Sequence, residues 1–140
     1  MNPVLIIKKN MQLNEELIQQ AEQQAKGLSY PKYVQKLKEI GVANYEVRVK
    51  NHNRKFTSQS GEELLLNGDL PVVECAENFS LEAVKEAVRR TQNGLTDYPS
   101  FLSEIAAAGV HNYLADLGAM KILYLGANAA DLYTEVIPEA

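Results

Sequence analysis

The spacing of hydrophobic residues changes along the chain from a helical period to an alternating one, and this change occurs twice. Residues 30–40 and 98–108 carry apolar side chains three and four positions apart, as on one face of an amphipathic helix. Residues 45–50, "YEVRVK", alternate apolar and polar side chains, as in a strand with one buried face. Residues 113–117, "YLADL", repeat this alternation more weakly. The pattern predicts a helix followed by a strand in each half of the chain.

The similarity of the two halves extends to the residues themselves. "YPKYVQKLKEIGVANY" at residues 30–45 and "YPSFLSEIAAAGVHNY" at residues 98–113 share six identities in sixteen positions. The identities are both members of the Tyr-Pro pairs, Gly41 with Gly109, Val42 with Val110, Asn44 with Asn112 and Tyr45 with Tyr113. A repeat of this kind predicts two copies of one structural unit.

Residues that begin and end helices stand at matching places in the two copies. Ser29 and Asp97 precede the Tyr-Pro pairs, where a side-chain oxygen can accept a hydrogen bond from the first helical turn. Gly41 and Gly109 follow the helices, where glycine adopts a positive φ without steric cost. We therefore expect Ser29 and Asp97 to be N-caps and the glycines to end the helices.

A second helix is expected upstream of each copy, and further strands downstream. The upstream helices run from Asn14 to Gly27 and from Ser80 to Gly94. Turn residues at 51–54 and 118–120 lead to second strands, with an optional third strand in each half. The expected fold class is α+β, with two pseudo-symmetric helix-helix-strand-strand repeats, optionally with a third strand, in one antiparallel sheet packed by helices. The repeat halves span about 14–66 and 80–137 of a single domain, residues 1–140.

Composition narrows the class of protein. At 140 residues and 46% hydrophobic content, the chain can bury a core without crosslinks. Its single cysteine, Cys75, excludes an intramolecular disulfide and favours a reducing compartment, so we expect a cytoplasmic protein. The N-terminal "PVLIIKKN" is too short for a membrane span and lacks the order of a signal peptide, so no membrane association is expected.

The chain resembles a known family in its most specific segment, "RRTQNGLTDYPSFLSEIAAAGV" at residues 89–110. The shared pattern is Gln-Asn-Gly, Thr-Asp-Tyr-Pro, an aromatic residue, a hydrophobic pair and Ala-Gly-Val. On this pattern the sequence is similar to the YbcV-like family of uncharacterised bacterial proteins, some of which are labelled phage envelope proteins. The resemblance extends from about residue 14 to residue 137. It implies a fold and no activity.

Motifs for the common cofactors and catalytic mechanisms are absent from the sequence. The two histidines, His52 and His111, and Cys75 do not lie at metal-ligand spacing, so we expect no metal site. Glycine-rich nucleotide loops and the Gly-x-Ser-x-Gly elbow are also missing, so we expect no cofactor. These absences favour a protein that binds rather than catalyses.

Tyrosines and polar residues of the repeat are the candidate ligand-binding residues. Tyr30 with Tyr45, and Tyr98 with Tyr113, could line a cleft near the pseudo-symmetry axis, apolar but with polar tips. The alternative is that these tyrosines are core rings, each with one satisfied hydroxyl group. His111 is also a candidate because its equivalent in the first copy is Ala43. The alternative for His111 is an ordinary turn residue.

Asp97 is the remaining candidate ligand-binding residue. The second copy carries one extra residue at or near Asp97, so the loop there departs from the shared plan. A carboxylate in this loop could contact a ligand. Its alternative role is the N-cap of the following helix.

The hairpin "VRVKNHNRKF" is the candidate partner surface. Arg48, Lys50, Arg54 and Lys55, together with His52, are expected to be exposed there. Such a ribbon could contact nucleic acid or an acidic protein, but the net charge of −4 and the absence of exposed aromatic residues disfavour nucleic acid. The alternative is that these charges protect a sheet edge from pairing.

Three functional hypotheses follow. The first is a non-enzymatic binding or protein-interaction module, with homodimerisation left open. The second is a small-molecule-binding protein, or an enzyme, that uses the tyrosine-lined cleft with His111 or Asp97 as proton carrier. The third is nucleic-acid binding through the basic hairpin.

Overall fold

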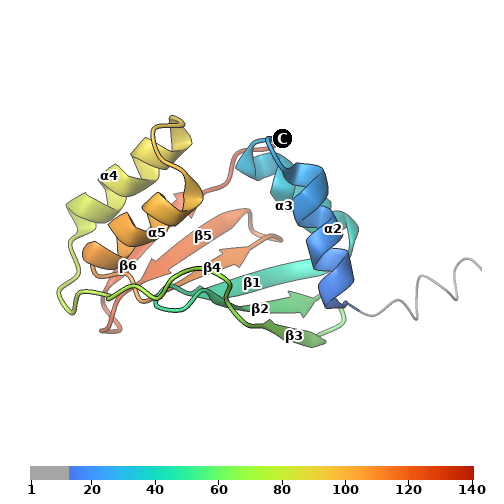
Figure 1. Ribbon diagram of the computed structural model, residues 1–140, viewed down its shortest axis with the longest axis horizontal. Coiled ribbons are helices and arrows are strands. Elements are labelled where there is room, and N and C mark those ends of the chain that lie inside the picture. The colour runs from blue at the N-terminus through green and yellow to red at the C-terminus, as the bar shows by residue number, and fades with distance from the viewer. Residues whose placement is uncertain (1–12) are drawn as a thin grey trace, which may run out of the picture.

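Two helix pairs and one antiparallel sheet make up the structure, a computed structural model that describes residues 13–140 (Figure 1). The first half contains α2 (Glu15–Ala25), α3 (Tyr30–Glu39), β1 (Val42–Arg48), β2 (Asn53–Ser58) and β3 (Glu63–Leu66). The second half contains α4 (Leu81–Gln92), α5 (Tyr98–Ala107), β4 (Asn112–Asp116), β5 (Lys121–Leu125) and β6 (Leu132–Val136). The predicted α+β class and the repeated helix-helix-strand-strand-strand order are confirmed.

The sheet has pseudo-two-fold symmetry about its centre. The strand order is β3-β2-β1-β4-β5-β6, so the first strand of each half meets the other in the middle. Tyr45 of β1 pairs with Ala115 of β4, and Val47 of β1 pairs with Tyr113 of β4. Equivalent residues of the two halves are 68 positions apart, so Tyr45 corresponds to Tyr113 and Val47 to Ala115. The symmetry therefore converts one of these pairs into the other. The axis therefore passes through the pair between them.

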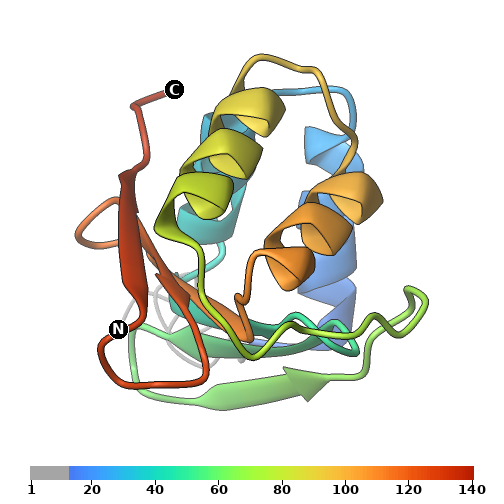
Figure 2. The same cartoon turned by 90° about the vertical axis from the view of Figure 1, so that its left-hand side faces the viewer.

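All four helices lie on one face of the sheet (Figure 2). α2 packs against α3 and α4 against α5, and the two pairs stand side by side over the strands. Their apolar stripes are buried, as the periodicity predicts: Ile18, Leu37, Val84 and Ile105 are each 0% exposed. The core therefore lies between the helices and one face of the sheet.

Alternation in β1 decides which side chains face this core. Tyr45, Val47 and Val49 are at most 3% exposed, whereas Arg48 is exposed on the opposite face. The predicted strand with one wet face is thus confirmed. Every second residue of the central strands points toward the space beneath the helices.

Helix ends follow the predicted chemistry with one exception. Asn14, Ser80 and Asp97 each accept a hydrogen bond from a backbone N–H of the first helical turn. Ser29 is the N-cap residue of α3, as predicted, but its side chain does not make the expected hydrogen bond. The amides of Lys32 and Tyr33 instead donate to the Ser29 carbonyl oxygen.

The expectation that the β1–β2 hairpin protects a sheet edge is also wrong. β1 is central and β2 is internal, and the edges are β3 and β6. The sequence pattern describes each strand but not its neighbours across the axis, and β1 pairs with β4.

Backbone hydrogen bonds fasten the connection between the halves, residues 67–78, to both of them. Val73 donates its N–H to the Lys50 carbonyl and Ala76 donates to the Ala106 carbonyl. Within the described part of the chain, none of the helices combines the length and the apolar character needed to cross a membrane.

Candidate functional site

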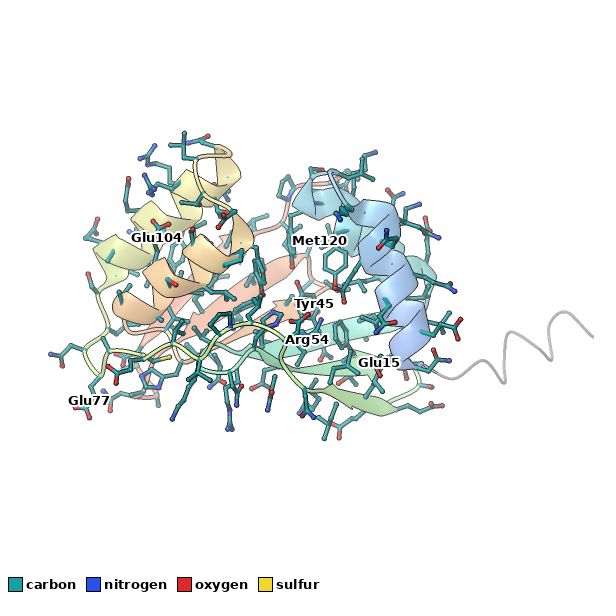
Figure 3. All side chains as sticks on the ribbon, viewed as in Figure 1. Glu15, Tyr45, Arg54, Glu77, Glu104 and Met120 are labelled. Atoms are coloured by element: carbon teal, nitrogen blue, oxygen red, sulfur yellow. The ribbon has the colours of Figure 1, made fainter. Side chains whose placement is uncertain are left out.

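A groove of about 1040 Å³ lies over the middle of the sheet, with walls from both helix pairs. Six of the seven tyrosines of the chain line it, together with two of its three phenylalanines. These residues are Tyr30, Tyr33, Tyr45, Tyr98, Tyr113, Tyr124, Phe56 and Phe101. Figure 3 draws the labelled Tyr45 in the space between the helix pairs. The groove is therefore the aromatic centre of the molecule.

Four aromatic rings form the floor of the groove, one from each of four neighbouring strands. Phe56 (β2), Tyr45 (β1), Tyr113 (β4) and Tyr124 (β5) follow one another with ring centroids 5.3, 6.3 and 5.8 Å apart. The register produces this row because Tyr45 pairs directly with Phe56, and Tyr113 with Tyr124. The four rings are at most 5% exposed, so they form an aromatic base beneath the groove and little of their surface is open to a ligand.

Two pairs of tyrosine hydroxyl groups meet above this floor. The hydroxyl oxygens of Tyr30 and Tyr45 are 2.5 Å apart, and those of Tyr98 and Tyr113 are also 2.5 Å apart. In each pair the first residue of a helix reaches the strand residue fifteen positions later. Each pair uses one hydroxyl proton internally, which leaves one proton to donate to another acceptor. The donor of the Tyr30–Tyr45 pair is free for a ligand, whereas that of the Tyr98–Tyr113 pair has His52 Nε2 within 3.0 Å.

Burial keeps these phenols protonated. It is the largest cause of the raised pKa of Tyr30, Tyr45 and Tyr113, and it raises the pKa of Tyr98 to about 12. The Tyr98 side chain lies at the rim and is 40% exposed, but its hydroxyl group points inward to Tyr113 and His52. At neutral pH the four hydroxyl groups are therefore hydrogen-bond donors and not phenolates.

His52 extends the second tyrosine pair into a longer chain of contacts. Its Nε2 is 3.0 Å from the Tyr98 hydroxyl oxygen and its Nδ1 is 3.4 Å from Oδ1 of Asp69. His52 is 7% exposed, and burial lowers its pKa, with the nearby Arg54 adding to the effect. The equivalent residue is Met120, which shares the positive φ but not the imidazole. The chain of contacts therefore exists in one half only.

Arg54 lies in the groove with its charge already paired. Its Nη1 is 3.1 Å from Oε1 of Glu22 on α2, and its guanidinium carbon is 6.0 Å from the centre of the Phe56 ring. The Arg54 side chain is only 13% exposed. The pair connects the α2 wall to the floor.

Glu135 of β6 is the other carboxylate of the groove, and neutral groups hold it. Its Oε1 accepts a hydrogen bond from the Tyr124 hydroxyl at 2.6 Å, and its Oε2 accepts one from the Gln92 amide, also at 2.6 Å. Among residues 13–140 no Lys, Arg or His lies within ion-pair distance of Glu135. Its negative charge is therefore not offset by a cation.

The structure brings four of the six predicted ligand-binding residues together. Tyr30, Tyr45, Tyr98 and Tyr113 all line the groove. Asp97 and His111 do not, which corrects the expectation that either serves the cleft as proton carrier. Asp97 is exposed and caps α5 through the Ser100 amide, 2.8 Å away. His111 donates from Nε2 to the Ala76 carbonyl, 3.0 Å away, and so fastens the connection between the halves.

The predicted basic surface is divided between the two faces of the sheet. Arg48 and Lys50 are exposed, and Lys55 lies between Glu46 and Glu63 at 3.9 and 3.6 Å. Arg54 instead faces the groove, because it shares a strand face with Phe56. His52 is buried as well. The expectation of one exposed basic ribbon is wrong, since strand alternation sends Arg54 inward.

Sequence reasoning did not single out several residues of the groove. Phe56 and Tyr124 are equivalent positions of the two halves, as are Tyr33 and Phe101, so aromatic residues at matching places were the available signal. Glu135 had no such signal, because its contacts with Gln92 span 43 positions of the chain.

Other kinds of chemistry find little support in the described residues. Residues 13–140 contain no group of three or more His, Cys, Asp or Glu side chains that could hold a metal ion. Cys75 is half-buried, and burial raises the pKa of its thiol, which disfavours the reactive thiolate.

The sequence matches a protein family for which no activity is described. The family model described as "protein of unknown function (DUF1398)" matches residues 18–136. No curated protein matches the sequence. The matched range includes the lining of the groove almost completely.

Proposed function

We propose that this chain, which belongs to the DUF1398 family of proteins of unknown function, is a non-enzymatic small-molecule-binding protein whose ligand lies in the tyrosine-lined groove. One observation carries the proposal: six of the seven tyrosines converge on a single groove and direct two pairs of hydroxyl groups into it. A core that needed only apolar packing gains nothing from so many phenol groups, which must each find a hydrogen-bond partner.

The size and lining of the groove indicate the kind of ligand. A volume of about 1040 Å³ lies at the upper end of the usual range for drug-sized ligands. The aromatic lining suits an apolar ring system, and the free proton of the Tyr30–Tyr45 pair suits a carbonyl or similar acceptor on that ring system. We expect a flat, mainly apolar molecule with at least one hydrogen-bond acceptor.

Binding is favoured over catalysis because the candidate acid-base groups are poorly matched to neutral pH. The phenols of the groove have raised pKa values, about 12 for Tyr98, so they are weak proton donors and are not available as bases. This supports a carrier or sensor role.

Prodan, a neutral fluorescent naphthalene with a carbonyl group, is a suitable probe. We expect it to bind one site per chain with a blue-shifted emission. We expect the double variant Tyr30→Phe with Tyr45→Phe to weaken its binding roughly fivefold, the value of one hydrogen bond of about 1 kcal/mol. We expect Tyr98→Phe with Tyr113→Phe to weaken it less, because His52 competes for the proton of that pair. Each variant removes both members of a pair, so no buried hydroxyl group is left unpartnered.

Two controls make this experiment decisive. Tyr133→Phe changes the one tyrosine that does not line the groove and should leave prodan binding unchanged. 2-Dimethylaminonaphthalene, which lacks the carbonyl group, should bind the wild type and the double variants equally. Absence of prodan binding, or equal prodan affinity in all the variants, would contradict the proposal.

Two finer assignments accompany this proposal. The segment at residues 89–110 supports a relationship to the YbcV-like bacterial proteins within the wider family. The lone cysteine supports a cytoplasmic location.

A protein-interaction role for the exposed Arg48 and Lys50 is compatible with a ligand sensor, in which a bound molecule alters contacts with a partner.

A further inference from the structure

The charges that line the groove do not cancel. Glu22 and Arg54 form an ion pair with each other, and burial favours the neutral form of His52. In the described part of the chain the remaining charged residue of the lining is Glu135, and its carboxylate accepts hydrogen bonds from the neutral Tyr124 and Gln92 side chains. The lining therefore holds one negative charge in excess.

Glu135 lies where its negative charge would interact with a molecule bound in the groove. It is half-buried and lines the groove beside Tyr124, at the β5–β6 end of the aromatic floor. Its charge also contributes, after burial, to the raised pKa of Tyr30 on the opposite helix pair. Attraction between opposite charges is stronger beside apolar walls than in open water. A cation in the groove would provide Glu135 with a partner that residues 13–140 do not supply.

The aromatic lining adds a second, independent preference for a cation. Faces of aromatic rings carry negative electrostatic potential, and cages of tyrosine side chains bind organic cations through it. Tyr124 belongs both to the aromatic floor and to the Glu135 contact. The carboxylate and the rings therefore favour the same charge at the same end of the groove.

An anionic ligand is disfavoured by the same geometry. Among residues 13–140, Arg54 is the only Lys or Arg that lines the groove, and Glu22 already contacts its Nη1 at 3.1 Å. The Arg54 Nε is buried and has no hydrogen-bond partner among the described residues. An anion beside the guanidinium would also meet the negative charge of the Glu22 carboxylate.

We propose that the groove binds an aromatic organic cation, with the positive charge beside Glu135 and the ring system between the helix pairs, above Tyr124, Tyr113 and Tyr45. This inference rests on the proposed small-molecule function and names the class of ligand for the same site. The hydroxyl pairs then bind a polar substituent of the ring system.

Two dyes with the same three-ring skeleton and opposite charges test the proposal. N-Methylacridinium is the cation and 9-anthracenecarboxylate is the anion, and fluorescence titration gives a dissociation constant for each. We expect the wild type to bind the cation roughly tenfold or more tightly than the anion. Glu135→Gln should weaken cation binding by roughly tenfold and leave anion binding equal or stronger.

Glu77→Gln is the matched control, since it removes the same charge from an exposed residue at the far end of the molecule (Figure 3). It should change neither affinity. Circular dichroism and the thermal midpoint establish that each variant is folded, and prodan binding establishes that the groove of Glu135→Gln is intact.

The outcomes separate this inference from the proposed function. If prodan binds but the two charged dyes bind equally, or if Glu135→Gln and Glu77→Gln behave alike, the preference for cations is overturned and the groove remains a binding site. If prodan and both dyes fail to bind, the proposed function is overturned and the cation proposal with it.

Discussion

Individual residues of the groove divide into those that the two halves share and those that only one half carries. The hydroxyl pairs are shared, with Tyr30 and Tyr45 repeated as Tyr98 and Tyr113. His52 is not shared, because its equivalent is Met120. Shared residues build the groove, and the unshared ones give it a polar character that differs from one side to the other.

His52 should make stability depend on pH. Burial lowers its pKa in the folded state below the value of about 6.5 in an unfolded chain, so the unfolded state binds more protons as the pH falls through that value. Stability from His52 is present above about pH 6.5 and is lost on acidification below it. We expect the thermal midpoint of the wild type to fall more steeply between pH 7.5 and 5.5 than that of His52→Asn.

Asparagine suits this test because it tolerates the positive φ of residue 52, which is 59°. It lacks a titrating group, so loss of the contact with Tyr98 lowers the midpoint equally at every pH. His111→Asn serves as the control for the second histidine. Parallel pH profiles for the wild type and His52→Asn would contradict the assignment.

At the scale of elements, the two glycines that end α3 and α5 have the same conformation in different surroundings. Gly41 and Gly109 both have φ of 94°. A Cβ atom on Gly41 would meet nothing within 4 Å, whereas one on Gly109 would collide with the backbone of Asn78 and Phe79. The second copy of the turn is pressed against the connection between the halves.

This difference predicts unequal effects of the same substitution. Gly41→Ala should lower the free energy of unfolding by about 1–2 kcal/mol, the cost of a positive φ for a residue with a side chain. Gly109→Ala should lower it by roughly 3 kcal/mol or more, because the collision with backbone atoms adds to that cost. Urea denaturation followed by circular dichroism measures both. Equal losses of unfolding free energy would show that the backbone of Asn78 and Phe79 moves aside at little cost.

At the scale of the whole molecule, the two halves share one sheet and one groove. β1 and β4 pair along five residues at its centre, and the aromatic floor crosses the boundary between Tyr45 and Tyr113. Neither half can close the groove alone. The repeat therefore describes the architecture, while folding is expected to be a property of the complete chain.

We expect a single cooperative unfolding transition. The chain contains no tryptophan, so Tyr33→Trp and Phe79→Trp each introduce a unique fluorescent probe, in the first and the second half. The two single-tryptophan variants should give the same urea midpoint, after allowance for the effect of each tryptophan on the free energy of unfolding. Adding Gly109→Ala should lower both midpoints alike. If Gly109→Ala leaves the urea midpoint reported by Tyr33→Trp unchanged, the two halves unfold independently.

Comparison of the expected and observed structures shows which features are local. The helix limits, Gly41 and Gly109 at positive φ, and the buried face of β1 were predictable from neighbouring residues. The four tyrosines of the hydroxyl pairs were predictable as a group because the repeat presents them twice. Asp97 and His111 were assigned to the cleft wrongly, since their departure from the repeat reflects a helix cap and a bond to the Ala76 carbonyl.

The sequence by itself determined the type, order and limits of the elements and the pseudo-symmetric plan, because caps, glycines and hydrophobic periods act over a few residues. Only the tertiary structure decided that β1 lies beside β4, that Arg54 faces inward, and that Glu135 comes to the end of an aromatic floor. These features depend on contacts between residues far apart in the chain, and a local pattern carries no record of which distant strand becomes its neighbour.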